Sequence, residues 1–289
     1  MEIDYLYSQF KPLLFSIGYS MLGSIEDSED LVQDTFLAVQ KMSLSTKEEP
    51  NNMKAYLCKI MTNRCLDLLK SSKNNREVYI GPWLPEPIIQ GVLEKEDPME
   101  KMILEETISY AFLVLLEQLN PTERAVFVLR EAFAFDFRMI SEILNKTESN
   151  CRKLFSRLQE KIQRSEQKEN RNLKEELVIA KRFIEAAETG NLDLLISLLT
   201  EDIVLITDAG GKTKAALRPI NQKKNVIAFL VGVSKKLISP AHIQCVIVNN
   251  QIGLMVTSEG EEPTLICFDL EGDSYRRIFM VRNPDKLKF

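Results

Sequence analysis

The chain has 289 residues, of which 45% are hydrophobic and 27% charged, with a formal net charge of −5. This is the composition of an ordinary soluble protein with enough chain for two or three domains, and the charge excludes a uniformly basic nucleic-acid coat. Its five cysteines are scattered without a CxxC pair, and the single His242 has no partner at ligand-like spacing, so neither a zinc site nor a cofactor is predicted. The odd cysteine count, with no signal peptide and no apolar run of membrane-spanning length, favours a reducing cytoplasm.

The first third of the chain predicts three helices, over residues 5–22, 28–42 and 53–72. Gly23 and Ser24 end the first, and Ser24 with Asp27 resembles a capping box. The second helix begins with acidic residues, which the helix dipole favours. Those acids therefore indicate either simple helix stabilisation or a docking face for a basic partner.

The third predicted helix is the most cationic part of this third of the chain. Its positive residues are Lys54, Lys59, Arg64, Lys70, Lys73 and Arg76. Tyr56 and Tyr79 flank the run, and basic residues beside aromatic rings suit single-stranded or melting nucleic acid because bases stack on the rings. A merely solvated helix face is the alternative.

The helical period stops in residues 74–98. Three prolines among residues 82–87 exclude a helix, and the only tryptophan of the chain, Trp83, lies with them. Because tryptophan commonly anchors buried contacts, we expect an extended linker in which Trp83 and Leu84 insert into a pocket of another domain. A local Trp–Pro cluster without a partner is the other interpretation.

Residues 100–118 predict another helix, and residues 119–162 predict a helix-turn-helix. Asn120, Pro121 and Thr122 open its first helix, a short helix follows over residues 136–144, and Thr147 caps the third. The inner stripe of the third helix is apolar. Its outer face carries Thr147, Ser149, Asn150, Arg152, Lys153, Ser156 and Arg157. Such residues can neutralise phosphates or bond base edges in a major groove, although solvated charged faces are also common.

From residue 173 the pattern changes to an α+β arrangement. Helices are predicted over residues 173–188, 192–199 and 222–236, and strands over 203–207, 242–249, 253–257, 264–270 and 275–281. The loop at residues 208–212 could cradle a phosphate, but it lacks the second half of a P-loop and the helix that follows one. A plain turn is favoured there.

Together these segments resemble an extracytoplasmic-function sigma factor, a promoter-recognition subunit of bacterial RNA polymerase, along nearly the whole chain. Residues 29–36 resemble the face that docks on the β′ clamp, which implies polymerase contacts at Asp30, Gln33, Asp34 and Phe36. Residues 55–70 resemble the segment that melts and reads the −10 element. The residues implied to contact −10 DNA are Asn63, Arg64, Asp67, Lys70, Lys73 and Arg76. Residues 119–162 resemble the segment that reads the −35 element, which gives that role to the seven outer-face residues named above.

Three short motifs resemble a subgroup of this family with a SnoaL-like C-terminal extension. Residues 83–87 read Trp-Leu-Pro-Glu-Pro, residues 208–212 read Asp-Ala-Gly-Gly-Lys, and residues 283–287 read Asn-Pro-Asp-Lys-Leu. The implied regulatory residues are Trp83, Leu84, Pro85, Glu86, Pro87, Asp208, Gly210, Gly211, Lys212, Asn283, Pro284, Asp285, Lys286 and Leu287. Two departures stand out: Asn74 and Asn75 interrupt a basic run, and Ala209 replaces a glycine whose backbone freedom that loop would use.

The resemblance implies a multidomain chain. Sigma region 2, an all-α bundle, would occupy residues 1–75, a linker 76–98, region 4 with its helix-turn-helix 99–168, and an α+β, cone-shaped SnoaL-like domain 169–289. The implied partners are core RNA polymerase, through its β′ clamp and β flap, and promoter DNA, without a membrane. We expect no catalysis. The extension would regulate in cis, held by the linker and the C-terminal tail in a compact form that restrains DNA binding and opens on the polymerase.

A ligand-sensing DNA-binding regulator is the alternative. The SnoaL-like fold resembles polyketide-cyclase and ketosteroid-isomerase-like domains, which can enclose an apolar ligand, and Asp208 could act as a base if a pocket raised its pKa. The single histidine and the lack of a clear acid–base pair disfavour catalysis. A free-standing repressor is disfavoured too, because it does not need a segment like residues 29–70.

Overall fold

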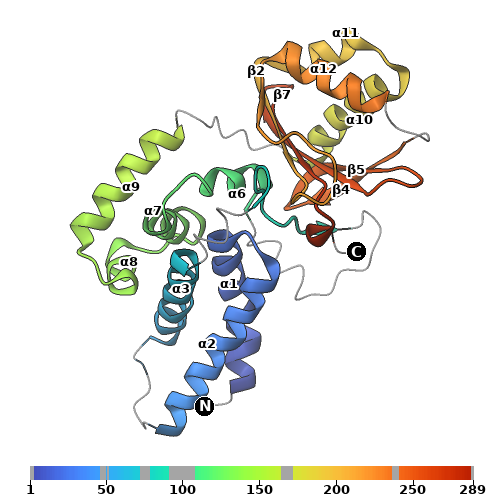
Figure 1. Cartoon of the computed structure of the whole chain (residues 1–289). Helices are drawn as coiled ribbons and strands as arrows, with labels where there is room; N and C mark the ends of the chain where they lie inside the picture. The colour runs from blue at the N-terminus through green and yellow to red at the C-terminus, as the bar shows by residue number, and fades with distance from the viewer. Residues whose placement is uncertain are drawn as a thin grey trace. The chain divides into compact units, whose positions relative to one another are not determined.

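The structure is a computed structural model that describes residues 3–45, 50, 52–71, 79–90, 108–163, 172–235 and 241–287. The chain forms two compact units. The first comprises residues 1–74, 96–108 and 112–166, and the second comprises residues 75–95, 109–111 and 167–289. The first unit is helical, whereas the second holds a curved sheet with helices beside it (Figure 1).

Three long helices open the first unit: α1 (Ile3–Leu22), α2 (Ile25–Ser45) and α3 (Met53–Ser71). α1 ends at Gly23, whose φ of +65° is a left-handed conformation that glycine adopts without strain. The Asp27 amide donates to Ser24 Oγ at 3.3 Å, so α2 begins earlier than the predicted residue 28. α1 packs against both α2 and α3, and their apolar stripes form a buried core.

A second group of helices follows: α6 (Tyr110–Leu116), α7 (Pro121–Phe127), the π-helical turn η1 (Val128–Ala132), α8 (Phe137–Leu144) and α9 (Glu148–Gln163). Asn120 and Glu123 form a reciprocal capping box at the start of α7, with Pro121 in its first turn. The predicted helix over residues 100–118 is present as α6 in its described part, and residues 100–107 lie outside the described residues.

The helix-turn-helix is formed by α8, a tight turn and α9. Asp136 caps α8 by accepting from the Met139 amide at 2.7 Å. α8 ends at Asn145, whose φ of +50° reverses the chain, and the Asn150 amide donates to Thr147 Oγ1 at 3.2 Å to begin α9. The predicted order of short helix, turn and long helix is confirmed.

The helix-turn-helix also packs on the N-terminal helices within the first unit. α3 contacts both α8 and α7. Lys59 Nζ donates to Asn145 Oδ1 at 3.3 Å, and Lys54 lies 5.2 Å from the centroid of the Phe135 ring. Beneath them, the buried Arg124 Nη1 donates to the Met21 carbonyl at 2.6 Å and to Glu117 Oε1 at 2.5 Å. Charge-assisted hydrogen bonds therefore join the two helical groups.

The second unit contains α10 (Leu173–Thr189), α11 (Leu192–Ser197), α12 (Lys223–Ser234) and the 3₁₀ turn η2 (Pro284–Lys286). Its described strands are β1 (Ile89–Gln90), β2 (Leu199–Asp208), β3 (Ile220–Asn221), β4 (His242–Val248), β5 (Gln251–Thr257), β6 (Thr264–Glu271) and β7 (Ser274–Val281). They form one sheet in the order β1-β4-β5-β6-β7-β2-β3. The fold class predicted for this part of the chain, helices followed by a curved sheet, is confirmed.

One pairing in the sheet is parallel, whereas the others are antiparallel. β2 and β7 run parallel, with Leu205 opposite Ile278 and Asp208 opposite Val281. Because β2 is the first long strand and β7 the last, the three antiparallel strands between them bring β7 back in the same direction as β2. This pairing places Asp208 and the residues after Val281 side by side at one corner of the sheet.

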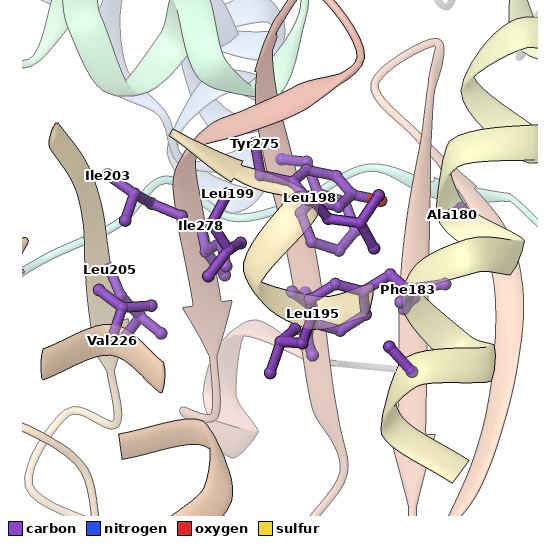
Figure 2. Close-up of a cluster of buried hydrophobic side chains, with 14 of the residues drawn as sticks. Ala180, Phe183, Leu195, Leu198, Leu199, Ile203, Leu205, Val226, Tyr275 and Ile278 are labelled. Atoms are coloured by element: carbon purple, nitrogen blue, oxygen red, sulfur yellow. The ribbon is translucent and has the colours of Figure 1, made fainter. Parts of the chain in front are cut away.

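One face of the sheet and the helices enclose the hydrophobic core of this unit. Figure 2 shows Phe183 and Ala180 of α10 facing Leu195, Leu198 and Tyr275 across this core. Phe183, Phe268 and Tyr275 also make edge-on or tilted ring contacts with centroids 4.3–5.5 Å apart. In the part of the chain that the structure describes, no helix is long and apolar enough to cross a bilayer.

Candidate functional site

The outer face of α9 is exposed. All seven residues predicted on it are exposed, whereas Cys151 and Leu158 on its inner stripe are buried. Arg152 is held by Glu148, four residues earlier, and its guanidinium lies 4.6 Å from the centroid of the Phe137 ring. The helix thus presents a cationic and amide-bearing surface of the kind that enters a major groove.

A second candidate surface lies on α2. Asp30, Gln33 and Asp34 are exposed, as their predicted role requires. Phe36 is different: it is only 5% exposed and its ring lies 5.0 Å from that of Tyr7, so the assignment of Phe36 to this surface is corrected to a core position. The exposed apolar member is Leu37, at 51% exposure, which continues the i, i+3, i+4, i+7 stripe begun by Asp30.

The cationic helix α3 has its predicted DNA-contacting residues in two settings. Asn63 and Arg64 are half-buried, and Arg64 Nη1 pairs with Asp34 Oδ2 at 2.9 Å. Asp67 and Lys70 are exposed and pair with each other at 3.1 Å. Lys73 and Arg76 lie outside the described residues. The Arg64–Asp34 pair joins the α2 surface to the α3 surface.

Within the second unit, the linker is bound to the sheet through a buried carboxylate, Asp208, at the end of β2. Asp208 Oδ1 accepts from the Tyr79 hydroxyl at 2.5 Å and from the Gly210 amide at 3.1 Å. Asp208 Oδ2 accepts from the Leu84 amide at 2.8 Å and from Lys286 Nζ at 2.8 Å. Every partner is a donor, which is what a fully buried carboxylate requires.

Lys286, in the 3₁₀ turn η2, completes this contact. Its ammonium donates to the Leu84 carbonyl at 2.5 Å, and it lies 4.1 Å from the centroid of the Trp83 ring and 5.1 Å from that of Tyr79. A buried ammonium between a carboxylate, a carbonyl and two aromatic faces is well compensated for its loss of water. We call this cluster of Tyr79, Trp83, Leu84, Asp208 and Lys286 the linker latch.

Tyr79 is therefore part of the latch, and the suggestion that it stacks beside a nucleic acid is corrected. Asn283 Nδ2 donates to its hydroxyl oxygen at 3.0 Å while that hydroxyl donates to Asp208. Burial raises the pKa of Tyr79 above its usual range, and the hydrogen bond to the Asp208 carboxylate and its charge raise it further. The phenol stays protonated and donating at neutral pH.

The rest of the linker extends the sheet. The Ile88 amide donates to Asn249 Oδ1 at 3.1 Å, and the Asn249 amide donates back to the Ile88 carbonyl at 3.0 Å. β1 then pairs antiparallel with β4, Ile89 lying opposite Val248. Pro85 is tied separately, because its carbonyl accepts from the Tyr110 hydroxyl at 2.8 Å, and Tyr110 packs edge-on against Phe279.

The glycine loop after β2 fits the linker closely. Gly210 and Gly211 have φ of +57° and +75°, and a Cβ at Gly210 would lie 2.5 Å from Asn283 Nδ2. Ala209 is absent from the described residues with positive φ, so alanine meets no strain where the related motif has glycine. Lys212 pairs with Asp285 at 2.5 Å on the exposed side. The loop is a linker-binding turn, as its Asp208 bonds show, rather than a phosphate cradle.

A cavity of about 630 Å³ lies on the other side of the sheet. Phe183, Leu195, Phe229, Ile243, Ile266 and Met280 supply much of its apolar lining. Asp208 is not among the lining residues, and its oxygens are occupied by the latch, so it is not placed to act there as a base. No group of three or more His, Cys, Asp or Glu side chains within the described ranges is arranged to hold a metal.

Several contributors to these sites escaped prediction from the sequence. Asn249 holds the linker through two hydrogen bonds to Ile88, and Tyr110 holds it through one to Pro85. Leu37 had a usable signal, since it shares the helical phase of Asp30, Gln33 and Asp34. Within the linker, Leu84, Pro85 and Pro87 are buried, whereas Trp83 is half-buried over Lys286.

Comparison with known proteins assigns these surfaces to a class. Residues 6–75 match the family described as sigma-70 region 2, and residues 109–161 match the family described as sigma-70, region 4. These are the promoter-recognition regions of bacterial transcription initiation factors. The two matched segments contain α2 and α3 on the one hand and the helix-turn-helix on the other.

The whole-chain relatives narrow the class. The chain is 28% identical over 294 residues to the ECF RNA polymerase sigma factor SigJ of Mycobacterium tuberculosis (strain ATCC 25618 / H37Rv), covering 96% of this chain and 92% of that protein. It is 29% identical over 198 residues to "Probable ECF RNA polymerase sigma factor SigI" of M. tuberculosis (strain CDC 1551 / Oshkosh), covering 68% and 66%. The crystal structure of M. tuberculosis SigJ shares the fold, with a TM-score of 0.79 and 24% identity over 98% of this chain and 97% of that one. The chain belongs to the extracytoplasmic-function family of RNA polymerase sigma factors, which direct initiation at specific promoters.

Proposed function

We propose that the surfaces above divide the work of initiation. Asp30, Gln33, Asp34 and Leu37 on α2 dock on the β′ clamp of core RNA polymerase, the exposed polar face of α3 meets the −10 element, and the outer face of α9 reads the −35 element. Lys153 and Arg157 would neutralise phosphates, while Asn150 and Ser149 at the start of α9 would bond base edges. The protein would act in the cytoplasm, without catalysis.

We further propose that the form described by the structure is a closed, inactive one. In the first unit α8 packs on α3, so the two helical groups that would read separate promoter elements are in contact with each other. Reading two elements spaced along a duplex requires those groups to move apart. The bond from Arg124 to the Met21 carbonyl crosses between the two groups and favours the closed form.

The linker latch supplies the regulation in cis. The observation that carries this proposal is the insertion of Lys286 between Asp208 and the Leu84 carbonyl, which ties the segment between regions 2 and 4 to the C-terminal domain. Residues 79–90, if released and fully extended, span roughly 40 Å. While the latch is closed, the linker cannot extend to separate the two DNA-binding regions. Binding to the polymerase would therefore have to open the latch.

In vitro transcription with purified core polymerase tests this function. The full chain, the Lys286→Met chain and a chain ending at residue 170 would be compared on a promoter library, with the exposed-pair variant Lys212→Met as the matched control. If initiation rises in the Lys286→Met chain and in the chain ending at residue 170, but not in Lys212→Met, the C-terminal domain inhibits initiation through the latch. Initiation by none of them would refute promoter-directed activity, and initiation that falls when the latch is broken would make the C-terminal domain an assembly aid instead.

Ligand sensing is a second candidate, favoured by the cavity. Its 630 Å³ volume and largely apolar lining are those of a small-molecule site, and it belongs to the same domain that holds the linker. A sensor of this kind would change the strength of the latch.

A further inference from the structure

The cavity has one polar feature that points to the chemistry of an occupant. Arg282, just after β7, lines it, and its buried Nε has no hydrogen-bond partner among the described residues. Its two other nitrogens are engaged: Nη1 donates to the Lys214 carbonyl at 2.5 Å, and Nη2 lies 3.6 Å from Glu261 Oε2. A buried donor without an acceptor is costly, so an acceptor oxygen in the cavity would be stabilised there.

The charges around the cavity decide what kind of acceptor fits. Arg282 is already paired with Glu261, and Glu188 and Glu262 also line the cavity. An anionic ligand would meet this excess of carboxylates, whereas a neutral carbonyl or hydroxyl oxygen would not. Because the lining is otherwise apolar, the remainder of the ligand must be apolar as well.

The cavity and the linker latch lie on opposite faces of the same two strands. Side chains alternate between faces along a strand. Thr207 lines the cavity and the next residue, Asp208, holds the linker. On β7 and just beyond it, Met280 and Arg282 line the cavity, while Phe279 contacts Tyr110 and Asn283 contacts Tyr79.

A short loop connects the two faces mechanically. Residues 209–216 leave Asp208, carry Gly210 and Gly211 under the linker, and return to the cavity at Ala215. Arg282 pins this loop at Lys214 and its amide donates to the Asp208 carbonyl at 2.7 Å. Thr207 Oγ1 donates to the Ala216 carbonyl at 2.8 Å. The side chains that would touch a ligand are those that fix the loop beneath the latch.

We propose that this cavity binds a neutral, largely apolar small molecule whose oxygen accepts from Arg282 Nε, and that its binding strengthens the linker latch through the loop at residues 209–216. The inference rests on the regulatory role given above to the C-terminal domain. A ligand that fits the cavity formed when the latch is closed stabilises that closed form by its own binding free energy. Because linkage is reciprocal, a variant that opens the latch must also weaken ligand binding, in proportion to the fraction of the closed form that it removes.

The test uses the full chain and three fluorescent probes that differ in polarity. Nile red is neutral and carries a carbonyl, N-phenyl-1-naphthylamine is neutral without oxygen, and 8-anilinonaphthalene-1-sulfonate is anionic. We expect Nile red to bind one site most tightly. Arg282→Met should weaken Nile red about tenfold more than it weakens N-phenyl-1-naphthylamine, because both probes lose the effect of the Arg282 contact with the loop and only Nile red also loses a charge-assisted hydrogen bond.

The reciprocal arm uses latch variants that do not line the cavity. Tyr79→Phe removes one hydroxyl, and Lys286→Met removes the buried ammonium; each should weaken Nile red about fivefold. Lys174→Met, at an exposed position of α10 away from the cavity and the loop, is the control and should leave the affinity unchanged. Circular dichroism establishes that each variant is folded. If Lys286→Met does not fold, Tyr79→Phe alone tests the coupling.

Two outcomes would overturn the proposal. The proposed site would be excluded if Nile red failed to bind. It would also be excluded if Nile red bound equally well after Val231→Trp and Ser234→Trp, which place large side chains in the cavity. Affinity that is unchanged in both latch variants removes the coupling. Neither result bears on promoter-directed transcription, which is measured without a probe and stands or falls separately.

Discussion

The Lys286 ammonium lies 2.8 Å from the Asp208 carboxylate, and the two side chains are only 6% and 0% exposed. A few residues away, Lys212 and Asp285 form a second Lys–Asp pair with side chains 50% and 62% exposed. Two pairs of the same chemistry thus flank one loop in opposite environments, which makes their energetics directly comparable.

Breaking the buried pair should be far more damaging than breaking the exposed one. Lys286→Met leaves the Asp208 charge buried without its cation and should lower the free energy of unfolding by about 3–5 kcal/mol. Lys212→Met should lower it by less than about 1 kcal/mol. Denaturant unfolding of the full chain measures both, and similar losses for the two variants would contradict the assignment of the latch to the buried pair.

Two neighbours on α2 should separate polymerase binding from stability. Phe36→Ala removes a core ring and should cost about 3–5 kcal/mol of stability. Leu37→Ala, at an exposed position, should change stability by less than about 0.5 kcal/mol yet weaken binding to core polymerase by more than about 1 kcal/mol. Thermal unfolding and equilibrium binding provide the two readouts. Wild-type polymerase affinity in Leu37→Ala would exclude Leu37 from the docking surface.

On α9, substitutions of Lys153 and Asn150 should change DNA binding in different ways. Lys153→Ala should weaken binding to all promoter sequences and reduce the slope of log affinity against log salt by about 1, because one phosphate contact is lost. Asn150→Ala should relax preference at a base position and keep that slope. The measurement is holoenzyme binding to matched promoter variants across salt, with the exposed Lys174→Ala of α10 as a charge control. Equal affinities, salt slopes and base preferences in all three variants would argue against DNA binding by the outer face of α9.

Arg124 should hold regions 2 and 4 together. Arg124→Met leaves Glu117 without its buried cation and removes the bond to the Met21 carbonyl, so the distance between dyes on the exposed faces of α2 and α9 should increase. Arg130→Met is the control, since Arg130 Nη1 donates within the helix-turn-helix segment, to the Phe135 carbonyl at 2.8 Å. A distance unchanged by Arg124→Met would rule out this arginine as a fastener of the closed form.

The Tyr79 hydroxyl gives the latch an alkaline limit. Its pKa is raised in the folded protein by burial, by the bond to Asp208 and by the charges of Asp208 and Asp285. A group whose pKa is raised in the folded protein contributes its full stabilisation below its unfolded pKa of about 10. That stabilisation is lost as pH rises from the unfolded pKa through the folded pKa. The stability difference between the wild type and Tyr79→Phe should thus be constant from pH 7 to 9 and shrink above about pH 10. A difference that grows with pH would show that Tyr79 ionises in the latch.

Local signals in the sequence were sufficient for most elements and insufficient for the latch. The caps at Asn120 and Asp136 and the turn at Asn145 define the helix-turn-helix because each acts on its own helix terminus. β1 was missed because two residues carry no alternation, and its partner β4 is more than 150 positions away in sequence. Similarly, the phase of α2 separates Phe36 from Leu37, whereas the motif alone assigned Phe36 to the surface.

The pairing of β1 with β4 has a consequence for the opened protein. β1 is an edge strand of the sheet, and it is contributed by the segment that joins the two DNA-binding regions. When that segment leaves, the backbone of β4 around Ile247 and Val248 loses its neighbour, and an unpaired strand edge is a template for self-association. An opened molecule away from the polymerase would therefore tend to aggregate, so activation and solubility are opposed unless opening takes place on the enzyme itself.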